Sequence, residues 1–208
     1  MKLVVKLLST TVLIFSTSFA YGLLLTVNPN PGDVDTSESL TLPVGAYWSN
    51  PAPAQLSGHI GGVSRSPFDG SGASPDYGDD NAIVHWSLGT HALNNTTMSW
   101  LNFAADQSSL TLAWGSPDTY NYLEFYSDNT LVGSVNGSQV INAGAQRGVS
   151  LAWVTASDMV FDQVKFISTR NAFEFANVSS TPVPAPASLA LLLAGVAMVG
   201  LRRRLFKD

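Results

Sequence analysis

The sequence predicts an all-β protein, built as an antiparallel β-sandwich of the jelly-roll kind. From residue 82 onward, short runs alternate apolar and polar residues, as in 110–114 (LTLAW) and 149–153 (VSLAW). A period of two is typical of a strand with one buried face. Turn-forming residues separate these runs, and no long segment between the two ends of the chain keeps the 3.6-residue period of a helix. The number and spacing of the runs favour a sandwich.

The strands are expected in two groups. Residues 23–78 are rich in Gly, Pro, Ser, Asn and Asp, which predicts one or two edge strands joined by long loops. The rest of the chain predicts further strands at 83–88, 98–103, 110–114, 123–126, 130–135, 149–153, 159–167 and 173–178.

The connections between these runs carry turn signals. Pro117 stands at the second position of a Ser-Pro-Asp-Thr turn, and residues 127–129 (SDN) suit a short hairpin loop. Asn136 and Gly137 form the dipeptide that accepts positive φ, which predicts a further turn there. Local sequence and the predicted sheet therefore agree.

The composition of residues 21–181 limits what this region does. Its length suits one domain with a sizeable core. It contains four basic and fourteen acidic residues, a formal charge of −10. Such a charge repels phosphate backbones, so no nucleic-acid partner is expected. The chain has no cysteine, which excludes disulfides and thiolate metal sites.

Residues 1–20 predict a signal peptide. Lys2 and Lys6 flank the start of an apolar run at 7–15, and Ser18 and Ala20 form a small-residue cleavage site. We therefore expect cleavage after Ala20 and export of the residues that follow.

Residues 182–208 predict a membrane-directed tail. Its three parts are the motif Val183, Pro184, Ala185 and Pro186, an uncharged, mostly apolar run at 187–201, and the cluster Arg202, Arg203 and Arg204. As a helix the run spans about 22 Å, less than the ~30 Å hydrocarbon core. The arginines are expected to stay in the cytoplasm. The run therefore suits transient insertion in the inner membrane better than a permanent span.

The order of Pro-x-Pro, apolar run and Arg cluster resembles the PEP-CTERM sorting signal of bacterial exosortase-dependent surface proteins, with Ala185 where that signal has glutamate. The resemblance implies processing near residues 184–186 by a membrane-embedded exosortase during export to the cell surface or the exopolysaccharide matrix. Segments 114–121 (WGSPDTYN), 123–126 (LEFY) and 171–177 (NAFEFAN) are similar to a family of such proteins. An ordinary C-terminal membrane anchor is the alternative interpretation of the tail.

One acidic loop is a candidate metal site. Asp76, Asp79 and Asp80 surround Gly78, and Ca²⁺ accepts carboxylate oxygens of this kind as ligands. A solvated acidic turn is the alternative, and no other cofactor is expected. The three histidines lack the spacing of a helical zinc site, and His85 is expected at the surface or on a strand face.

Aromatic residues suggest a second kind of site. Six of them are candidates for a platform on which sugar rings stack: Trp48, Tyr77, Trp86, Tyr120, Tyr122 and Tyr126. Tyr120 and Tyr122 lie near a turn and are the expected exposed pair, whereas Trp114 and Trp153 are expected in the core.

These features predict an exported, non-enzymatic protein of the cell surface or extracellular matrix. Its expected partners are an exosortase-type processing enzyme and an exopolysaccharide. No serine lies in a Gly-x-Ser-x-Gly motif, and no pair of carboxylates stands out for acid–base catalysis. A secreted carbohydrate-binding module and a carbohydrate-active enzyme are the alternatives.

Overall fold

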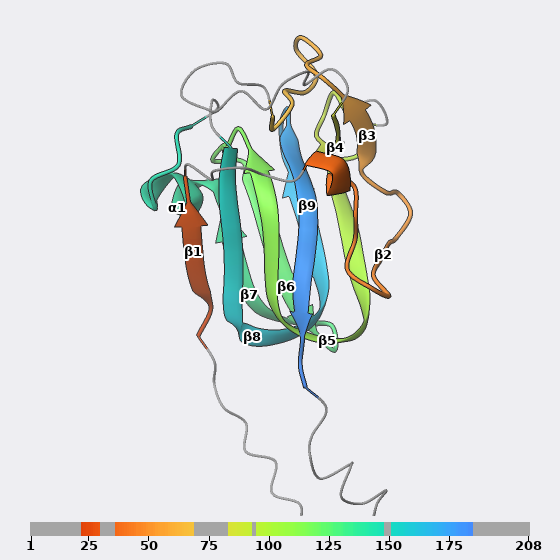
Figure 1. The fold of residues 1–208 in the computed structure, drawn as a ribbon, viewed down its shortest axis with the longest axis vertical. Coiled ribbons are helices and arrows are strands. Elements are labelled where there is room, and N and C mark those ends of the chain that lie inside the picture. Colours follow the sequence, from red (N-terminus) through yellow and green to blue (C-terminus); the bar gives the residue numbers. More distant parts are fainter. Residues whose placement is uncertain (1–21, 30–35, 69–82, 93–94, 148–150, 185–208) are drawn as a thin grey trace, which may run out of the picture.

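The computed structural model describes residues 22–29, 36–68, 83–92, 95–147 and 151–184 (Figure 1). In chain order the elements are β1 (Leu24–Asn28), the 3₁₀ helix η1 (Thr36–Glu38), β2 (Tyr47–Trp48), β3 (Ala54–Ser57), β4 (Val84–Leu88), β5 (Met98–Gly115), β6 (Asn121–Ser127), β7 (Thr130–Asn136), the helix α1 (Gly137–Asn142), β8 (Leu151–Ser168) and β9 (Phe173–Pro182). The strands of the described residues pair antiparallel in one hydrogen-bonded sheet. The prediction of an all-β protein is confirmed.

The sheet is built on two long strands. β5 and β8 each contain 18 residues and pair with each other along most of their length, starting with Met98 opposite Ile167. The register of this pair shifts between Asn102 and Ser109. Both strands bend near this point, at the lower end of the molecule in Figure 1. Extra residues on one strand of a pair bend the strand in this way.

The bend divides the sheet into two layers. In the half with the C-terminal part of β5, β9 pairs with β5 and β1 pairs with β8, so the first layer has the order β3-β4-β9-β5-β8-β1. In the other half β2 pairs with β5 and β6 pairs with β8, which gives the second layer the order β2-β5-β8-β6-β7. β5 and β8 therefore belong to both layers.

Aromatic side chains fill the space between the layers. Phe166 of β8, in the second layer, packs against Phe175 of β9, in the first, with ring centroids 4.6 Å apart. The ring centroids of Trp48 in β2 and Trp86 in β4 lie 5.6 Å apart across the same space. Fully burying one such side chain stabilises the fold by roughly 1.5–3 kcal/mol. This interior holds the domain together without disulfides.

Both long strands unite runs that the sequence predicts as separate strands. The runs 98–103 and 110–114 both belong to β5, and the runs 149–153 and 159–167 both contribute to β8 from residue 151 onward. In β5 the prediction of separate strands was wrong because residues 104–106 are small or charged and break the apolar alternation. They are exposed at the bend, while the strand continues through them.

Among the described residues of 22–68 there are three short strands, where the sequence predicts one or two in residues 23–78. The additional strand is β2, in which only Tyr47 and Trp48 pair with β5. A two-residue strand is too short to show any alternation, so periodicity could not reveal it.

The hairpin loop predicted at 127–129 is confirmed, because Asp128 and Asn129 have φ of 49° and 63° between β6 and β7. Positive φ at both central residues matches the twist of a two-residue hairpin. The turn predicted at Asn136 and Gly137 was wrong. Asn136 has φ −122° and caps α1, where its side chain accepts a hydrogen bond from Gln139 N at 3.0 Å.

The described part of the chain begins and ends at the same end of the molecule. β1 starts and β9 finishes at the lower end in Figure 1, close to the bend of the long strands. The predicted signal peptide, including Ser18 and Ala20, lies outside the described residues, as does the tail from Ala185 through Pro186 to the three arginines. Among the residues that are described, no helix is long and apolar enough to cross a bilayer.

Gly137→Ala should destabilise the domain, because a Cβ at this position would lie 1.9 Å from the carbonyl oxygen of Asp118. We expect a loss of about 1–3 kcal/mol in the free energy of unfolding, measured by urea denaturation. Gly61→Ala is the matched control, since a Cβ there meets no atom within 4 Å. Equal stability of the two variants would contradict the close approach of α1 to the turn before β6.

Candidate functional site

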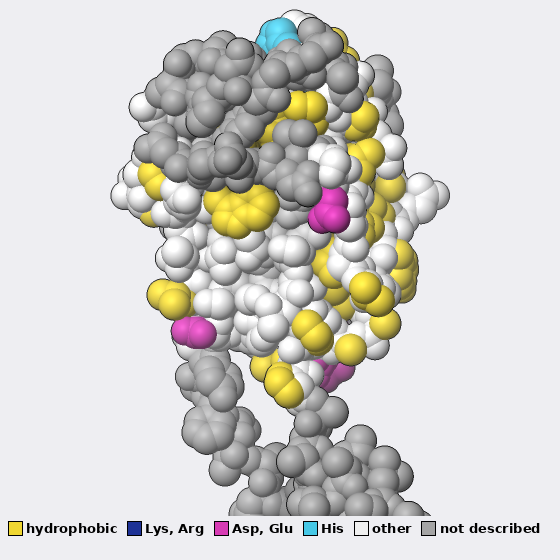
Figure 2. Space-filling model, in the orientation of Figure 1, with side chains coloured by type: hydrophobic (Ala, Val, Ile, Leu, Met, Phe, Trp, Pro, Cys, Tyr) yellow, Lys and Arg dark blue, Asp and Glu magenta, His cyan; other side chains and the backbone are white. Residues whose placement is uncertain are grey.

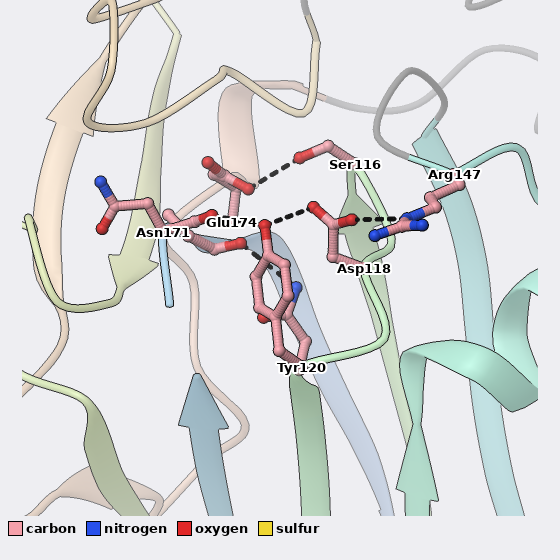
Figure 3. A network of polar contacts seen from close by, with 8 residues as sticks. Ser116, Asp118, Tyr120, Arg147, Asn171 and Glu174 are labelled. Atoms are coloured by element: carbon pink, nitrogen blue, oxygen red, sulfur yellow. Dashed lines mark hydrogen bonds and ion pairs between the residues drawn. The ribbon is translucent and has the colours of Figure 1, made fainter. Parts of the chain in front are cut away.

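A group of hydrogen-bonded polar side chains closes the upper end of the molecule, where β5 ends and β6 and β9 begin (Figure 3). We call this group the polar end network; its labelled members are Ser116, Asp118, Tyr120, Arg147, Asn171 and Glu174. They come from segments far apart in the sequence, because antiparallel strands bring several connections to one end of the sheet. Contacts between their side chains therefore add to the backbone hydrogen bonds that join these loops, such as the one that Thr169 N donates to the Tyr120 carbonyl oxygen at 3.2 Å.

Glu174 is the buried acid of this network, with 2% of its surface exposed. Its Oε1 accepts a hydrogen bond from the backbone N–H of Arg65 at 2.8 Å, and its Oε2 accepts one from the Ser116 hydroxyl at 2.8 Å. Burial raises the pKa of Glu174 to about 7, although these two hydrogen bonds oppose the shift. The carboxyl group therefore titrates near neutral pH.

Tyr120 and Asp118 form the second part of the network. The Tyr120 hydroxyl lies 2.6 Å from Asp118 Oδ2 and also contacts the carbonyl oxygen of Asn171. Arg147 donates from Nε to the other Asp118 oxygen at 3.2 Å. Burial, followed by the hydrogen bond to Asp118, raises the pKa of Tyr120 above its usual range. Tyr120 is therefore a neutral hydrogen-bonding group at physiological pH.

Asn171 connects the network to two further loops. Its Nδ2 donates to the carbonyl oxygen of Gly62 at 2.7 Å, and its Oδ1 accepts from the backbone N–H of His91 at 2.6 Å. The segment 58–68 is thus attached to the β8–β9 connection by Asn171 and to β9 by Glu174. Because these oxygens and donors bond to one another, the arrangement fixes loops instead of presenting a free acid.

His85 lies under the same segment. It is fully buried on β4, and its Nε2 is 2.9 Å from the Ser64 hydroxyl. The sequence-based expectation of a position on a strand is confirmed, and that of a surface position was wrong, because residues 58–68 fold back over this face of the sheet, where Phe68 is also buried. Burial lowers the pKa of His85 to about 4, so the ring is neutral at pH 7.

The structure describes none of the predicted metal ligands and only two residues of the predicted processing motif. Asp76, Asp79 and Asp80 lie outside the described residues. Across the described ranges, no three or more His, Asp or Glu side chains are grouped to hold a metal ion. Val183 and Pro184 follow directly on β9, and Val183 donates its N–H to the Asp106 carbonyl at 2.8 Å.

The predicted aromatic residues that the structure describes are dispersed, and Tyr77 lies outside the described residues. Trp48 and Trp86 belong to the interior, and Tyr120 belongs to the polar end network. Tyr120 and Tyr122 are both half-buried, so the expectation of an exposed pair was wrong. Trp114 is fully buried, which confirms its expected place in the core. Trp153 is only half-buried and packs with Phe68 outside the main core, so that expectation was wrong in part.

A different set of aromatic residues gathers on the outer face of the second layer. In one row across the strands, Trp100 lies opposite Lys165, which lies opposite Glu124. The neighbouring rows add the other side chains of what we call the aromatic face: Tyr47, Asn102, Gln163 and Tyr126 in one row, and Met98, Ile167 and Tyr122 in the other. Tyr122 and Tyr126 were candidates from the sequence. Trp100 was not among those candidates.

The outer face of the first layer is different. Hydroxyl side chains dominate it, and Figure 2 shows its centre as an area that is neither charged nor hydrophobic. Its rows contain Thr26, Thr155, Thr111 and Ser179, and then Ser157, Ser109 and Thr181. The two outer faces of the domain therefore have distinct chemistry.

Comparison with protein-family models, with curated proteins and with solved structures finds no match for this chain.

Glu174→Gln should change how stability depends on pH. The pKa of Glu174 is about 7 in the folded protein against 4.5 in the unfolded chain. The native protein therefore loses stability as pH rises through this window, by about 1.4 kcal/mol per pKa unit and about 3 kcal/mol in all. The variant keeps a similar shape but does not titrate, so it should gain stability relative to the native protein between pH 5 and pH 8.

Urea unfolding at pH 5, 6, 7 and 8 measures this difference. His85 is present in both proteins, so its contribution to the pH dependence cancels when the two free energies of unfolding are subtracted. Glu38→Gln is the control, because it removes a carboxylate from the exposed surface. A difference between Glu174→Gln and the native protein that stays constant with pH would contradict the burial of an ionisable Glu174.

Proposed function

We propose that this chain is an exported, non-enzymatic protein of the bacterial cell surface or extracellular matrix, delivered through an exosortase-type C-terminal sorting signal. The observation that carries the proposal is the order of Val183 to Pro186, the apolar run 187–201 and the three arginines, placed directly after the last strand of the domain. Export begins with the signal peptide at residues 1–20.

The end of β9 supports access to the tail while the domain is folded. Within the part of the chain that the structure describes, the last backbone hydrogen bond of this strand region is donated by Val183, which is 36% exposed. Pro184 has no N–H to donate, and a proline disfavours helix at the residue before it. An enzyme in the membrane could therefore reach residues 184–186 without unfolding the sheet.

The arginines and the short apolar run define the membrane step. Arg202, Arg203 and Arg204 hold the end of the tail in the cytoplasm, because a charged side chain resists passage through the hydrocarbon core. The run 187–201 spans less than the core as a helix, so its stay in the inner membrane is brief. Processing near 184–186 then releases the domain to the outside.

The placement of the chain ends gives the attached domain an orientation. β1 starts and β9 ends at the end opposite the polar end network (Figure 1). A tail at that end directs the polar end network away from the membrane. We propose that the two layers form a β-sandwich of the jelly-roll kind that serves as a displayed binding module, and we assign it no reaction.

Mass spectrometry of the cell-surface or matrix fraction tests the proposal. Trypsin cleaves after Lys165, Arg170 and Arg202, so an unprocessed chain gives a peptide spanning 171–202. We expect instead a peptide that starts at Asn171 and ends at a non-tryptic position within about 183–187. The peptide 166–170 is the internal control for recovery. Recovery of the intact 171–202 peptide from that fraction would contradict processing and favour a plain membrane anchor.

A further inference from the structure

We infer that the aromatic face of the second layer binds an uncharged polysaccharide chain. This face combines tyrosine and tryptophan rings with two amides on neighbouring strands. Tyr47, at one side of it, is 59% exposed. A hexose ring has an apolar face of C–H groups and a rim of hydroxyls, so it needs flat apolar surfaces next to hydrogen-bonding groups. The aromatic rings supply the apolar surfaces, and the half-buried Gln163 amide supplies hydrogen-bonding groups, whereas Asn102 is only 9% exposed and holds Gln163 in place.

The charges on this face indicate a neutral ligand. Lys165 Nζ lies 3.7 Å from Glu124 Oε2, so the two charges of the central row pair with each other. The face therefore offers no unbalanced charge to an ionic polymer. The domain as a whole carries a formal charge of −10, which disfavours an anionic polysaccharide.

The side chains of the face are held in place by one another. The Tyr126 hydroxyl donates to Glu124 Oε2 at 2.9 Å, and the Lys165 ammonium lies 5.4 Å from the centre of the Trp100 ring. The rings of Trp100 and Tyr126 are in contact, with centroids 5.0 Å apart. A surface whose side chains are fixed before binding loses less conformational entropy when a ligand arrives.

The two amides are fixed in the same way. Gln163 donates from Nε2 to Asn102 Oδ1 at 3.1 Å, and Asn102 donates from Nδ2 to the Ser49 hydroxyl at 2.8 Å. These bonds orient a row of amides beside Tyr126, at the strand spacing of about 4.8 Å. The rows run across three or four strands, which suits an extended chain of several sugar units better than a single monosaccharide.

The saccharide site and the sorting proposal can fail separately, because binding by the purified protein does not depend on removal of the tail. The full chain would be kept in a polyoxyethylene detergent, which contains no sugar. Native gels that contain a linear β-glucan, a galactomannan, a xylan or the anionic polymer alginate then report binding as retarded migration. We expect retardation by at least one of the three neutral polysaccharides and none by alginate.

Trp100→Ala and Tyr126→Ala are the variants of the site, and each should weaken binding by about tenfold or more. Trp153→Ala is the matched control, because it removes a half-buried tryptophan from the outer face of the first layer. It should leave binding unchanged. Circular dichroism and thermal unfolding of each variant establish that it is folded; for a variant that is not, Tyr126→Phe and Gln163→Ala on the same face take its place.

Several results would overturn the inference. They are the absence of retardation by every neutral polysaccharide, stronger retardation by alginate, or equal binding by the native protein and folded variants of the aromatic face. Sedimentation tests a further result that would overturn it. If the native protein is a dimer, Trp100→Ala is a monomer and neither binds saccharide, this face belongs to a contact with a second copy of the chain.

Discussion

The pairing of β5 with β8 is the constraint on which the rest of the structure depends. Each strand continues through the bend, so one hydrogen-bonded ladder supplies the centre of both layers. Every other strand except β3, β4 and β7 pairs directly with one of these two. The aromatic interior forms because the bend brings Phe166 against Phe175. A domain without cysteine is thereby held by pairing and packing alone.

The two ends of this frame have different roles. At the upper end, Glu174, Asn171 and Tyr120 bind the loops together, and the cost of burying Glu174 appears as its raised pKa. At the lower end, the described chain begins and ends beside the bend, next to the proposed sorting tail. The aromatic face lies on strands between these ends. The sheet therefore separates the proposed attachment from the proposed recognition.

Local sequence predicted the strands well where side chains alternate, as in β4, β6 and β7, and predicted the Asp128-Asn129 loop from its turn chemistry. It could not predict that the runs on either side of residues 104–106 form one strand, because the bend interrupts the pattern. The sequence predicted a turn at Asn136 and Gly137 instead of a helix start, because helix caps and turns favour the same residue types. Nothing local marks Glu174 as buried, since its partners lie at Arg65 and Ser116. Nothing local places Trp100 on the outer face for the same reason: the face that a strand residue occupies is set by distant partners.

Hydrogen–deuterium exchange under native conditions tests the central claim most directly, namely that the two layers are one cooperative sheet joined by β5 and β8. The claim predicts that the slowest amides lie in these two strands on both sides of the bend, and that both halves exchange at a common rate set by global unfolding. Faster exchange throughout the second layer than in the first would show that the layers open independently. It would contradict the account of a continuous frame that supports the aromatic face.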